Sequence, residues 1–143
     1  IDKLAKKHPD WSFTLVGDQK YISQNSNVKI IGHVKSTELL DLYNSHQFYL
    51  QLSTSEGFPN ALGEAMAAGC VPIGSAVGAI PEIIGDSGIV LVKKELTLLE
   101  NQIFKLLNQD LAAFSQKASL RILKLFNFEK RKKALLEALN LIN

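Results

Sequence analysis

Two glutamates, Glu56 and Glu64, are the side chains whose type and spacing most suggest chemistry. Glu56 follows an apolar run at 48–52 that is typical of a strand, and Glu64 falls inside a helical pattern at 61–68. The segment between the two carboxylates therefore joins the end of a strand to the start of a helix. Because the first N–H groups of a helix have no partner inside it, this junction can bind a phosphate.

Each carboxylate needs a partner other than the phosphate, because like charges repel. Hydroxyl groups meet that need, so we expect Glu64 to bind ribose hydroxyls and Glu56 to bind hydroxyls of a sugar beyond the phosphates. The pattern therefore fits a nucleoside diphosphate sugar as the ligand. The two carboxylates would bind its ribose and its sugar, and the backbone N–H groups would bind the diphosphate between them. The free N–H groups around Asn60, Ala61 and Leu62 are expected to meet the diphosphate, and Gly57 lets the backbone turn closely past the ligand.

Two other interpretations of the glutamate pair stay open at this point. Acidic residues favour helix N-termini, so Glu56 and Glu64 could be ordinary solvated caps. A glycoside hydrolase also works with two carboxylates, but it would not need a helix end that is ready for a phosphate. The Gly-Phe-Pro-Asn segment at 57–60 and its strand-to-helix setting favour the nucleotide-sugar hypothesis.

Short strand-like runs alternate with helical patterns along the chain, which is typical of a parallel sheet built from βαβ units. The runs predict strands at 13–16, 28–31, 48–52, 71–74 and 89–92, a polar loop at 18–27, and helices at 1–8, 36–45, 61–68 and 81–84. From residue 95 onward we expect a helical tail, with a break near Asn127. The sequence therefore predicts one domain over residues 1–143, an α/β Rossmann-like fold with helices on both faces of a parallel sheet.

The same patterns predict helix ends and core residues. Ser36 or Thr37 is expected to cap the N-terminus of the helix at 36–45. Gly69 is expected to end the helix at 61–68. The side chains expected in the core are Leu39, Leu40, Leu42, Tyr43, Cys70, Leu98, Leu99, Ile103, Leu106 and Leu107. His8 and His46 fall at helix ends, where surface or capping roles are expected.

The composition excludes several classes of protein. The chain has 143 residues, of which 46% are hydrophobic and 21% charged, so disordered and collagen-like proteins are excluded. A net charge of only +2 gives no reason to expect nucleic acid as a partner. No apolar run reaches the roughly 20 residues that span a bilayer, and no cluster of His and Cys indicates a metal site. The single cysteine favours a reducing compartment, so we expect a cytoplasmic location.

The segment from Glu56 to Glu64 resembles the Glu-x7-Glu motif of family-4-type retaining glycosyltransferases with the GT-B fold. The resemblance continues through 64–73 and 78–84, and upstream it includes 9–17 and 28–34. It covers roughly residues 1–95. The resemblance implies that the chain is the C-terminal, donor-binding half of such an enzyme.

By this resemblance, Glu56 contacts the donor sugar near the reacting centre and Glu64 binds the ribose. The resemblance also implies that the backbone of the segment between them holds the diphosphate and the adjoining sugar, through Gly57, Phe58, Pro59, Asn60, Ala61 and Leu62. Gly17, His33 and Val34 are implied to bind the nucleotide, with His33 and Val34 lining the base pocket mainly through their backbone. The resemblance also implies that the enzyme uses no catalytic metal or other cofactor, because in this family amides and basic side chains stabilise the departing diphosphate. The implied reaction transfers a sugar from a nucleotide sugar to a glycan or lipid-linked acceptor with retention.

The chain departs from the family pattern in several places. The family's first strand, whose glycine-rich loop brings an Arg and a Lys to the diphosphate, falls before Ile1, and so does the acceptor domain. We therefore expect a piece of a longer chain that is inactive by itself. Gly78-Ala79 stands where the family usually has two glycines, and the loop after Gly17 lacks a second glycine. A sugar-nucleotide epimerase of the same fold and a non-catalytic binding module remain as alternatives.

The C-terminal part of the sequence is basic. Lys130, Arg131, Lys132 and Lys133 follow Lys117, Arg121 and Lys124. A solvated helix face is one interpretation. Contact with anionic lipid or with a lipid-linked acceptor is the other, and it would place the protein at the inner face of the membrane.

Overall fold

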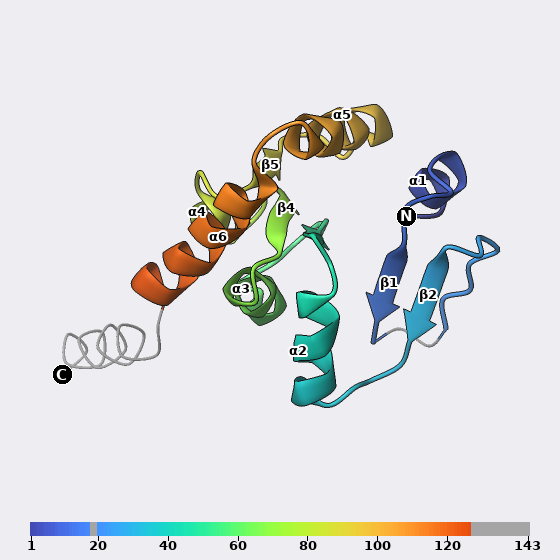
Figure 1. The fold of residues 1–143 in the computed structure, drawn as a ribbon, viewed down its shortest axis with the longest axis horizontal. Coiled ribbons are helices and arrows are strands. Elements are labelled where there is room, and N and C mark those ends of the chain that lie inside the picture. Colours follow the sequence, from blue (N-terminus) through green and yellow to red (C-terminus); the bar gives the residue numbers. More distant parts are fainter. Residues whose placement is uncertain (18–19, 127–143) are drawn as a thin grey trace.

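The computed structural model describes residues 1–17 and 20–126. The strands are β1 (Phe13–Val16), β2 (Val28–Ile31), β3 (Phe48–Gln51), β4 (Val71–Ser75) and β5 (Ile89–Leu91). The helices are α1 (Asp2–Lys7), α2 (Ser36–Asn44), α3 (Asn60–Ala67), α4 (Ile80–Ile84), α5 (Leu96–Leu107) and α6 (Leu111–Leu125) (Figure 1). Each predicted strand and helix up to residue 92 is confirmed within one residue at either end. The predicted break near Asn127 lies outside the described residues.

The strands pair in parallel, as predicted, but they form two ladders. β1 pairs with β2, with Phe13 opposite Val28, and β4 pairs with both β3 and β5. Within the described residues, β1 and β3 share no ladder, although β1 is the strand of its pair that lies nearer to the three-stranded sheet (Figure 1). Side chains connect the two parts: Thr14 Oγ1 in β1 lies 3.0 Å from Nε2 of His46, which precedes β3.

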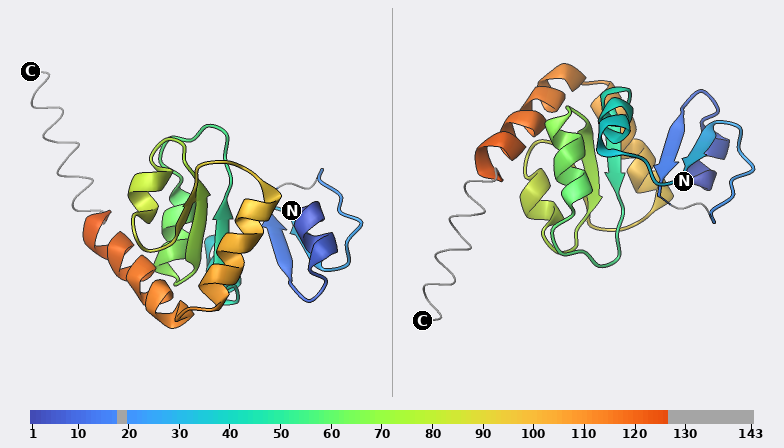
Figure 2. Two further views of the ribbon diagram at one scale, coloured as in Figure 1. Left: turned by 90° about the horizontal axis from the view of Figure 1, so that it is seen from above. Right: turned by 90° about the horizontal axis from the view of Figure 1, so that it is seen from below.

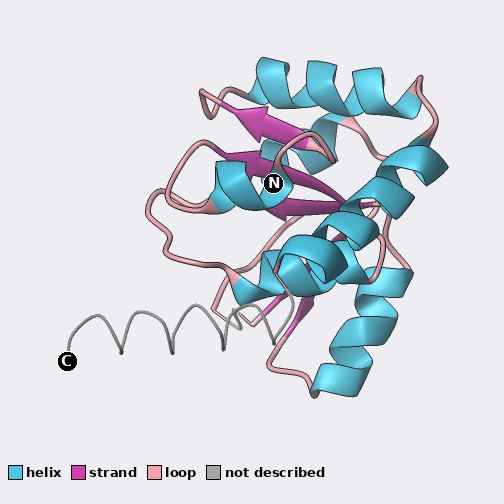
Figure 3. Ribbon diagram, turned by 90° about the vertical axis from the view of Figure 1, so that its left-hand side faces the viewer, coloured by secondary structure: helices cyan, strands magenta, loops and turns pink. Residues whose placement is uncertain are grey.

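Alternate residues of the strands face opposite layers of helices, as the period of two requires. On one face, Val71 and Ile73 of β4 pack with Leu4 of α1 and with Leu99, Ile103 and Leu106 of α5. On the other face, side chains of α3, α4 and α6 form a second buried cluster against Tyr49 and Val90. Figure 3 shows the helices around the strands, and Figure 2 shows the α1–β1–β2 part at one end of the molecule with α6 at the other. The three-layer α/β architecture is therefore confirmed.

Fewer side chains of α2 are buried than the sequence predicted. Tyr43 is buried against Ala65 and Cys70, and Leu39 packs on the same cluster, whereas the side chain of Leu40 is 50% exposed. The cause is the narrow line of contact, which follows Leu39 and Tyr43 at i and i+4 and leaves the neighbouring position in solvent. The predicted cap was also wrong: Lys35 is the N-cap of α2 and gives no side-chain hydrogen bond, while Ser36 is already helical.

The core of α5 matches the prediction at three positions and differs at its end. Leu99, Ile103 and Leu106 are buried, and Leu98 packs partly against them, but Leu107 is 41% exposed. Leu107 is the last residue of α5, and it lies off the contact stripe that ends at Leu106. Cys70 is buried in the core, as predicted.

Two histidines expected at helix ends have different roles. Nδ1 of His46 lies 2.8 Å from the carbonyl oxygen of Leu42, so His46 does cap the end of α2. His8 does more than cap α1: its Nε2 lies 2.6 Å from Oε1 of Glu100, and its ring stacks on Trp11 at 4.1 Å between centroids. His8 is nevertheless the C-cap of α1, so the capping alternative is confirmed, and its contacts with α5 leave its side chain only 16% exposed.

Candidate functional site

The candidate site is the junction between β3 and α3, where Glu56 is half-buried and Asn60 exposed. The helix begins with Pro59 as its N-cap, in an extended conformation and without a side-chain cap. The Pro59 carbonyl accepts a hydrogen bond from the Leu62 amide at 3.1 Å. The first N–H groups of α3, those of Asn60 and Ala61, are therefore presented without a capping side chain, as a phosphate site requires.

Glu56 is held by polar side chains of its own strand and loop. Its Oε2 accepts hydrogen bonds from Nε2 of Gln51 at 3.2 Å and from Oγ of Ser53 at 3.0 Å. Gln51 Nε2 also donates to Ser53 Oγ at 2.7 Å, and the Tyr49 hydroxyl donates to Gln51 Oε1 at 3.1 Å. These contacts make one connected network that begins in β3 and ends on the carboxylate.

The loop after β4 supports the backbone of this segment. Ser75 Oγ donates to the carbonyl of Ser53 at 2.7 Å, and the Ala79 amide donates to the carbonyl of Gly57 at 3.3 Å. Gly78 has a φ of +51° and passes so close that an added Cβ would lie 1.9 Å from the carbonyl oxygen of Glu56. Only glycine fits this position without moving the Glu56 backbone.

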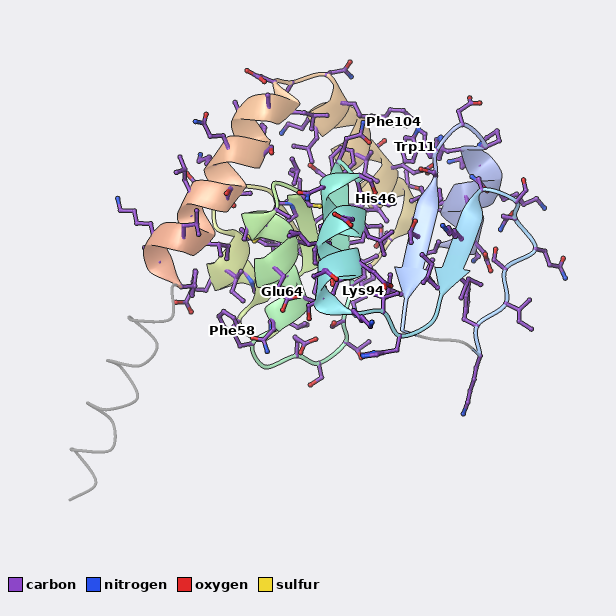
Figure 4. All side chains as sticks on the ribbon, turned by 60° about the horizontal axis from the view of Figure 1, so that its bottom comes forward. Trp11, His46, Phe58, Glu64, Lys94 and Phe104 are labelled. Atoms are coloured by element: carbon purple, nitrogen blue, oxygen red, sulfur yellow. The ribbon has the colours of Figure 1, made fainter. Side chains whose placement is uncertain are left out.

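Glu64 projects from the second turn of α3 and is exposed. Burial, followed by the negative charges of Glu64 and Glu56, raises the pKa of Tyr49 to about 12. Both carboxylates therefore act electrostatically on one tyrosine of β3. Figure 4 shows Glu64 and Phe58 at the same end of the molecule, the end toward which the arrowheads of β1 and β2 point.

The residues between the glutamates divide into anchors and open positions. Leu62 and Pro59 are buried, and the half-buried ring of Phe58 lies 5.7 Å from that of Phe126 at the end of α6. Gly57 is exposed, and an added Cβ there would meet no protein atom within 4 Å. The anchors fix the path of the loop, and the open positions leave its backbone accessible to a ligand.

The comparisons with known proteins assign this chain to a family. The family described as Glycosyl transferases group 1 matches residues 1–110. The chain belongs to this glycosyltransferase family. A human relative, one of the subunits of phosphatidylinositol N-acetylglucosaminyltransferase, is 26% identical over 127 residues, which are 79% of this chain and 26% of that protein. The chain thus spans about a quarter of the length of this curated relative.

Solved structures show the fold of this glycosyltransferase domain. Anabaena HepE, solved in complex with UDP, superimposes with a TM-score of 0.81 at 22% identity, over 97% of this chain and 43% of that one. The C-terminal domain of a group 1 glycosyltransferase, LpcC of Francisella tularensis, gives a TM-score of 0.71 at 22% identity, over 88% of this chain and 75% of that one. The fold is therefore that of the C-terminal half of a GT-B glycosyltransferase, as the sequence predicted.

The residues predicted to bind the nucleotide lie after β1 and β2 of the glycosyltransferase domain. Gly17 donates from its amide to the carbonyl of Ile31 at 2.9 Å and is exposed, as is His33. Val34 is half-buried and lines a shallow depression of about 280 Å³ together with Ile31, Glu38, Asp41 and Leu42. The structure thus places Val34 in a concave surface, and the nucleotide contacts of Gly17, His33 and Val34 stay predictions.

Three residues of the network around Glu56 were not singled out from the sequence: Tyr49, Gln51 and Ser53. A signal for one of them exists, because Gln51 is polar in the otherwise apolar run at 48–52. Within residues 1–17 and 20–126, no group of three His, Cys, Asp or Glu side chains is arranged to hold a metal ion. In the same residues, no helix is long and apolar enough to cross a membrane.

Proposed function

We propose that this chain is the donor-binding domain of a retaining glycosyltransferase, which transfers a hexose-type sugar from a nucleotide sugar to a glycan or lipid-linked acceptor. The observation that carries this proposal is the uncapped start of α3 between Glu56 and Glu64. The UDP complex reported for the structural neighbour HepE supports a nucleotide-sugar donor. Family membership favours glycosyl transfer over the epimerase reaction and over a non-catalytic module.

In the proposed site, each group meets one part of the donor. Glu56 contacts the sugar, the backbone of 57–62 binds the diphosphate, and Glu64 binds the ribose. His33 and Val34 line the base pocket, with Gly17 nearby. The N–H groups at the start of α3 stabilise the negative charge that develops on the departing diphosphate, so no catalytic metal and no cofactor is needed.

The acceptor is proposed to bind another domain of the full-length protein, in the cytoplasm or at the inner face of the membrane. The described basic residues of α6 give limited support to membrane contact, because two of them have structural partners. Lys117 pairs with Asp86 at 2.7 Å, and Arg121 donates to the carbonyl of Ile83 at 2.8 Å. Lys124 is exposed. The basic run at 130–133 lies outside the described residues.

Calorimetric titration of the full-length protein with UDP, GDP, ADP and their common sugar conjugates tests the proposal. We expect one nucleotide to bind selectively. Glu56→Ala should abolish transfer and leave nucleotide affinity nearly intact, because the carboxylate meets the sugar and not the nucleotide. Failure to bind any nucleotide would contradict the donor-site assignment and favour a non-catalytic module. Conversion of the donor without an acceptor would identify an epimerase instead.

A further inference from the structure

We propose that Gln51 is the positioning residue that holds Glu56 in its working conformation, and that Tyr49 in turn fixes the orientation of Gln51. This inference rests on the proposed function, in which Glu56 contacts the donor sugar. It adds two residues of β3 whose side chains touch neither donor nor acceptor in that proposal. It also assigns separate roles to the two oxygens of the Glu56 carboxylate.

The first step is the geometry at Glu56. Both hydrogen bonds that the described residues donate to this carboxylate, from Gln51 and Ser53, end on Oε2. The two donors also bind each other: Gln51 Nε2 donates to Ser53 Oγ at 2.7 Å, the shortest of the three hydrogen bonds. Two donors on one oxygen restrict rotation of the carboxylate, so Oε1 is the oxygen left to accept from a sugar hydroxyl.

The second step is the orientation of the Gln51 amide. An ionised carboxylate only accepts hydrogen bonds, so Gln51 must present its NH₂ group to Glu56. The amide oxygen then faces the opposite way, where the Tyr49 hydroxyl donates to it at 3.1 Å. Without that hydroxyl, the amide could turn its oxygen toward the carboxylate and repel it. Tyr49 therefore selects the orientation in which Gln51 supports Glu56.

The third step is the rigidity of Tyr49. Its ring lies in β3 and packs edge to face on Tyr43 of α2, with centroids 5.8 Å apart and an angle of 79° between the planes. Its hydroxyl is protonated at neutral pH, as that of any ordinary tyrosine is, so it is available to donate to Gln51. Because Tyr49 is held rigidly in β3, its hydrogen bond fixes Gln51, and Gln51 in turn fixes the position of the Glu56 carboxylate relative to the strand.

The test compares Gln51→Leu, Tyr49→Phe and Tyr43→Phe in the full-length protein, with the nucleotide sugar that the titration selects as the probe. Tyr43→Phe is the matched control, because the Tyr43 ring packs on Tyr49 but has no hydrogen bond to Gln51 among the described residues. We expect Gln51→Leu to lower kcat roughly 10- to 100-fold, as for a misplaced reacting group, and Tyr49→Phe to lower it less. The affinity for the nucleotide without sugar should stay within about twofold, which a misfolded variant would not show.

A double variant separates positioning from an independent effect. If Tyr49 acts through Gln51, then Tyr49→Phe combined with Gln51→Leu should lose no more activity than Gln51→Leu alone. Equal activity of Gln51→Leu and the unmodified protein would overturn the positioning role while leaving Glu56 in place. An active Glu56→Ala variant would overturn the proposed role of Glu56 itself, and the inference with it. An additive loss in the double variant would overturn the role given to Tyr49, because Tyr49 would then act by a route other than Gln51.

Discussion

His8 and Glu100 are separated by 92 positions in the sequence, yet Nε2 of His8 lies 2.6 Å from Oε1 of Glu100. The other carboxylate oxygen, Oε2, lies 2.6 Å from Nζ of Lys7. Glu100 is only 4% exposed. The His8 ring stacks on Trp11, and Trp11 in turn packs edge to face on Phe104 of α5 (Figure 4). The His8–Glu100 pair fastens α1 to α5 and so attaches the N-terminal ladder to the rest of the domain.

The pair predicts a specific loss of stability in acid. Hydrogen bonds from Lys7 and His8 hold the pKa of Glu100 below its usual value. A carboxylate with a lowered pKa in the folded state contributes stability above its unfolded pKa of about 4.3, and that contribution is lost as the pH falls through the folded value. Glu100→Gln should therefore be less stable than the unmodified protein at neutral pH and show a smaller further loss in acid. Urea unfolding between about pH 7 and pH 3 measures both effects.

Glu95→Gln is the matched control for that prediction. Glu95 lies 3.9 Å from Lys93, and both side chains are well exposed, so the pair contributes little. Its unfolding free energy should follow that of the unmodified protein at every pH. If Glu100→Gln lost as much stability between neutral pH and acid as the unmodified protein, the role given to the His8–Glu100 pair would be contradicted.

Gly78→Ala should damage the donor site without touching a ligand. The new Cβ would lie 1.9 Å from the carbonyl oxygen of Glu56, and the φ of +51° adds strain for any side chain. We expect a loss of more than about 1 kcal/mol in stability and weaker binding of the nucleotide sugar. Gly63→Ala is the control, since its Cβ would meet Ile122 at an ordinary 3.9 Å and alanine favours a helix interior. Thermal unfolding and calorimetry would compare them, and a Gly78→Ala variant that binds normally would contradict the packing described.

Glu64→Ala should weaken nucleotide binding by roughly 1.5–3 kcal/mol, as for the loss of hydrogen bonds to a charged group. Its stability should change little, because the side chain is exposed. Glu82→Ala removes another exposed carboxylate, from the first turn of α4, and should leave the affinity unchanged. Calorimetric titration with the nucleotide distinguishes the two variants. Unchanged affinity in Glu64→Ala would rule out the ribose contact.

Asp110→Ala should destabilise the protein away from the donor site. Asp110 is the N-cap of α6, and its Oδ1 accepts from the Ala113 amide at 3.1 Å. Loss of such a cap costs about 1 kcal/mol, which Asp110→Ser should largely restore. Nucleotide affinity should be the same in all three proteins. A fall in the melting temperature shared by Asp110→Ala and Asp110→Ser would show that the cap is not the cause.

The sequence predicted most of the secondary structure because the patterns are strong and local. The strands at β1 and β2 matched to the residue, and Gly69 ends α3 with a φ of +93°. The start of α3 between Glu56 and Glu64 was also predictable, since strand end, turn and helix start are adjacent in the chain. Local order of this kind needs no knowledge of distant contacts.

Features that depend on distant packing could not be predicted in this way. The exposure of Leu40 and Leu107 depends on how much of α2 and α5 is covered by neighbouring elements. The helical periodicity of the sequence does not give the width of the covered face. The His8–Glu100 pair joins residues with no shared local pattern. The network from Tyr49 to Glu56 depends on side-chain rotamers, for which the single polar residue Gln51 was the only local sign.

The division of the strands into two ladders has a consequence for how the domain opens. The β1–β2 ladder has no backbone hydrogen bonds to β3 among the described residues, and it is held to the rest by side-chain contacts and by α1. β4 lies between two strands, and each of its residues is buried. The two ladders should therefore behave as separate cooperative units in amide hydrogen exchange. The amides of β1 and β2 would exchange through partial opening, whereas those of β4 would exchange only when the whole domain unfolds.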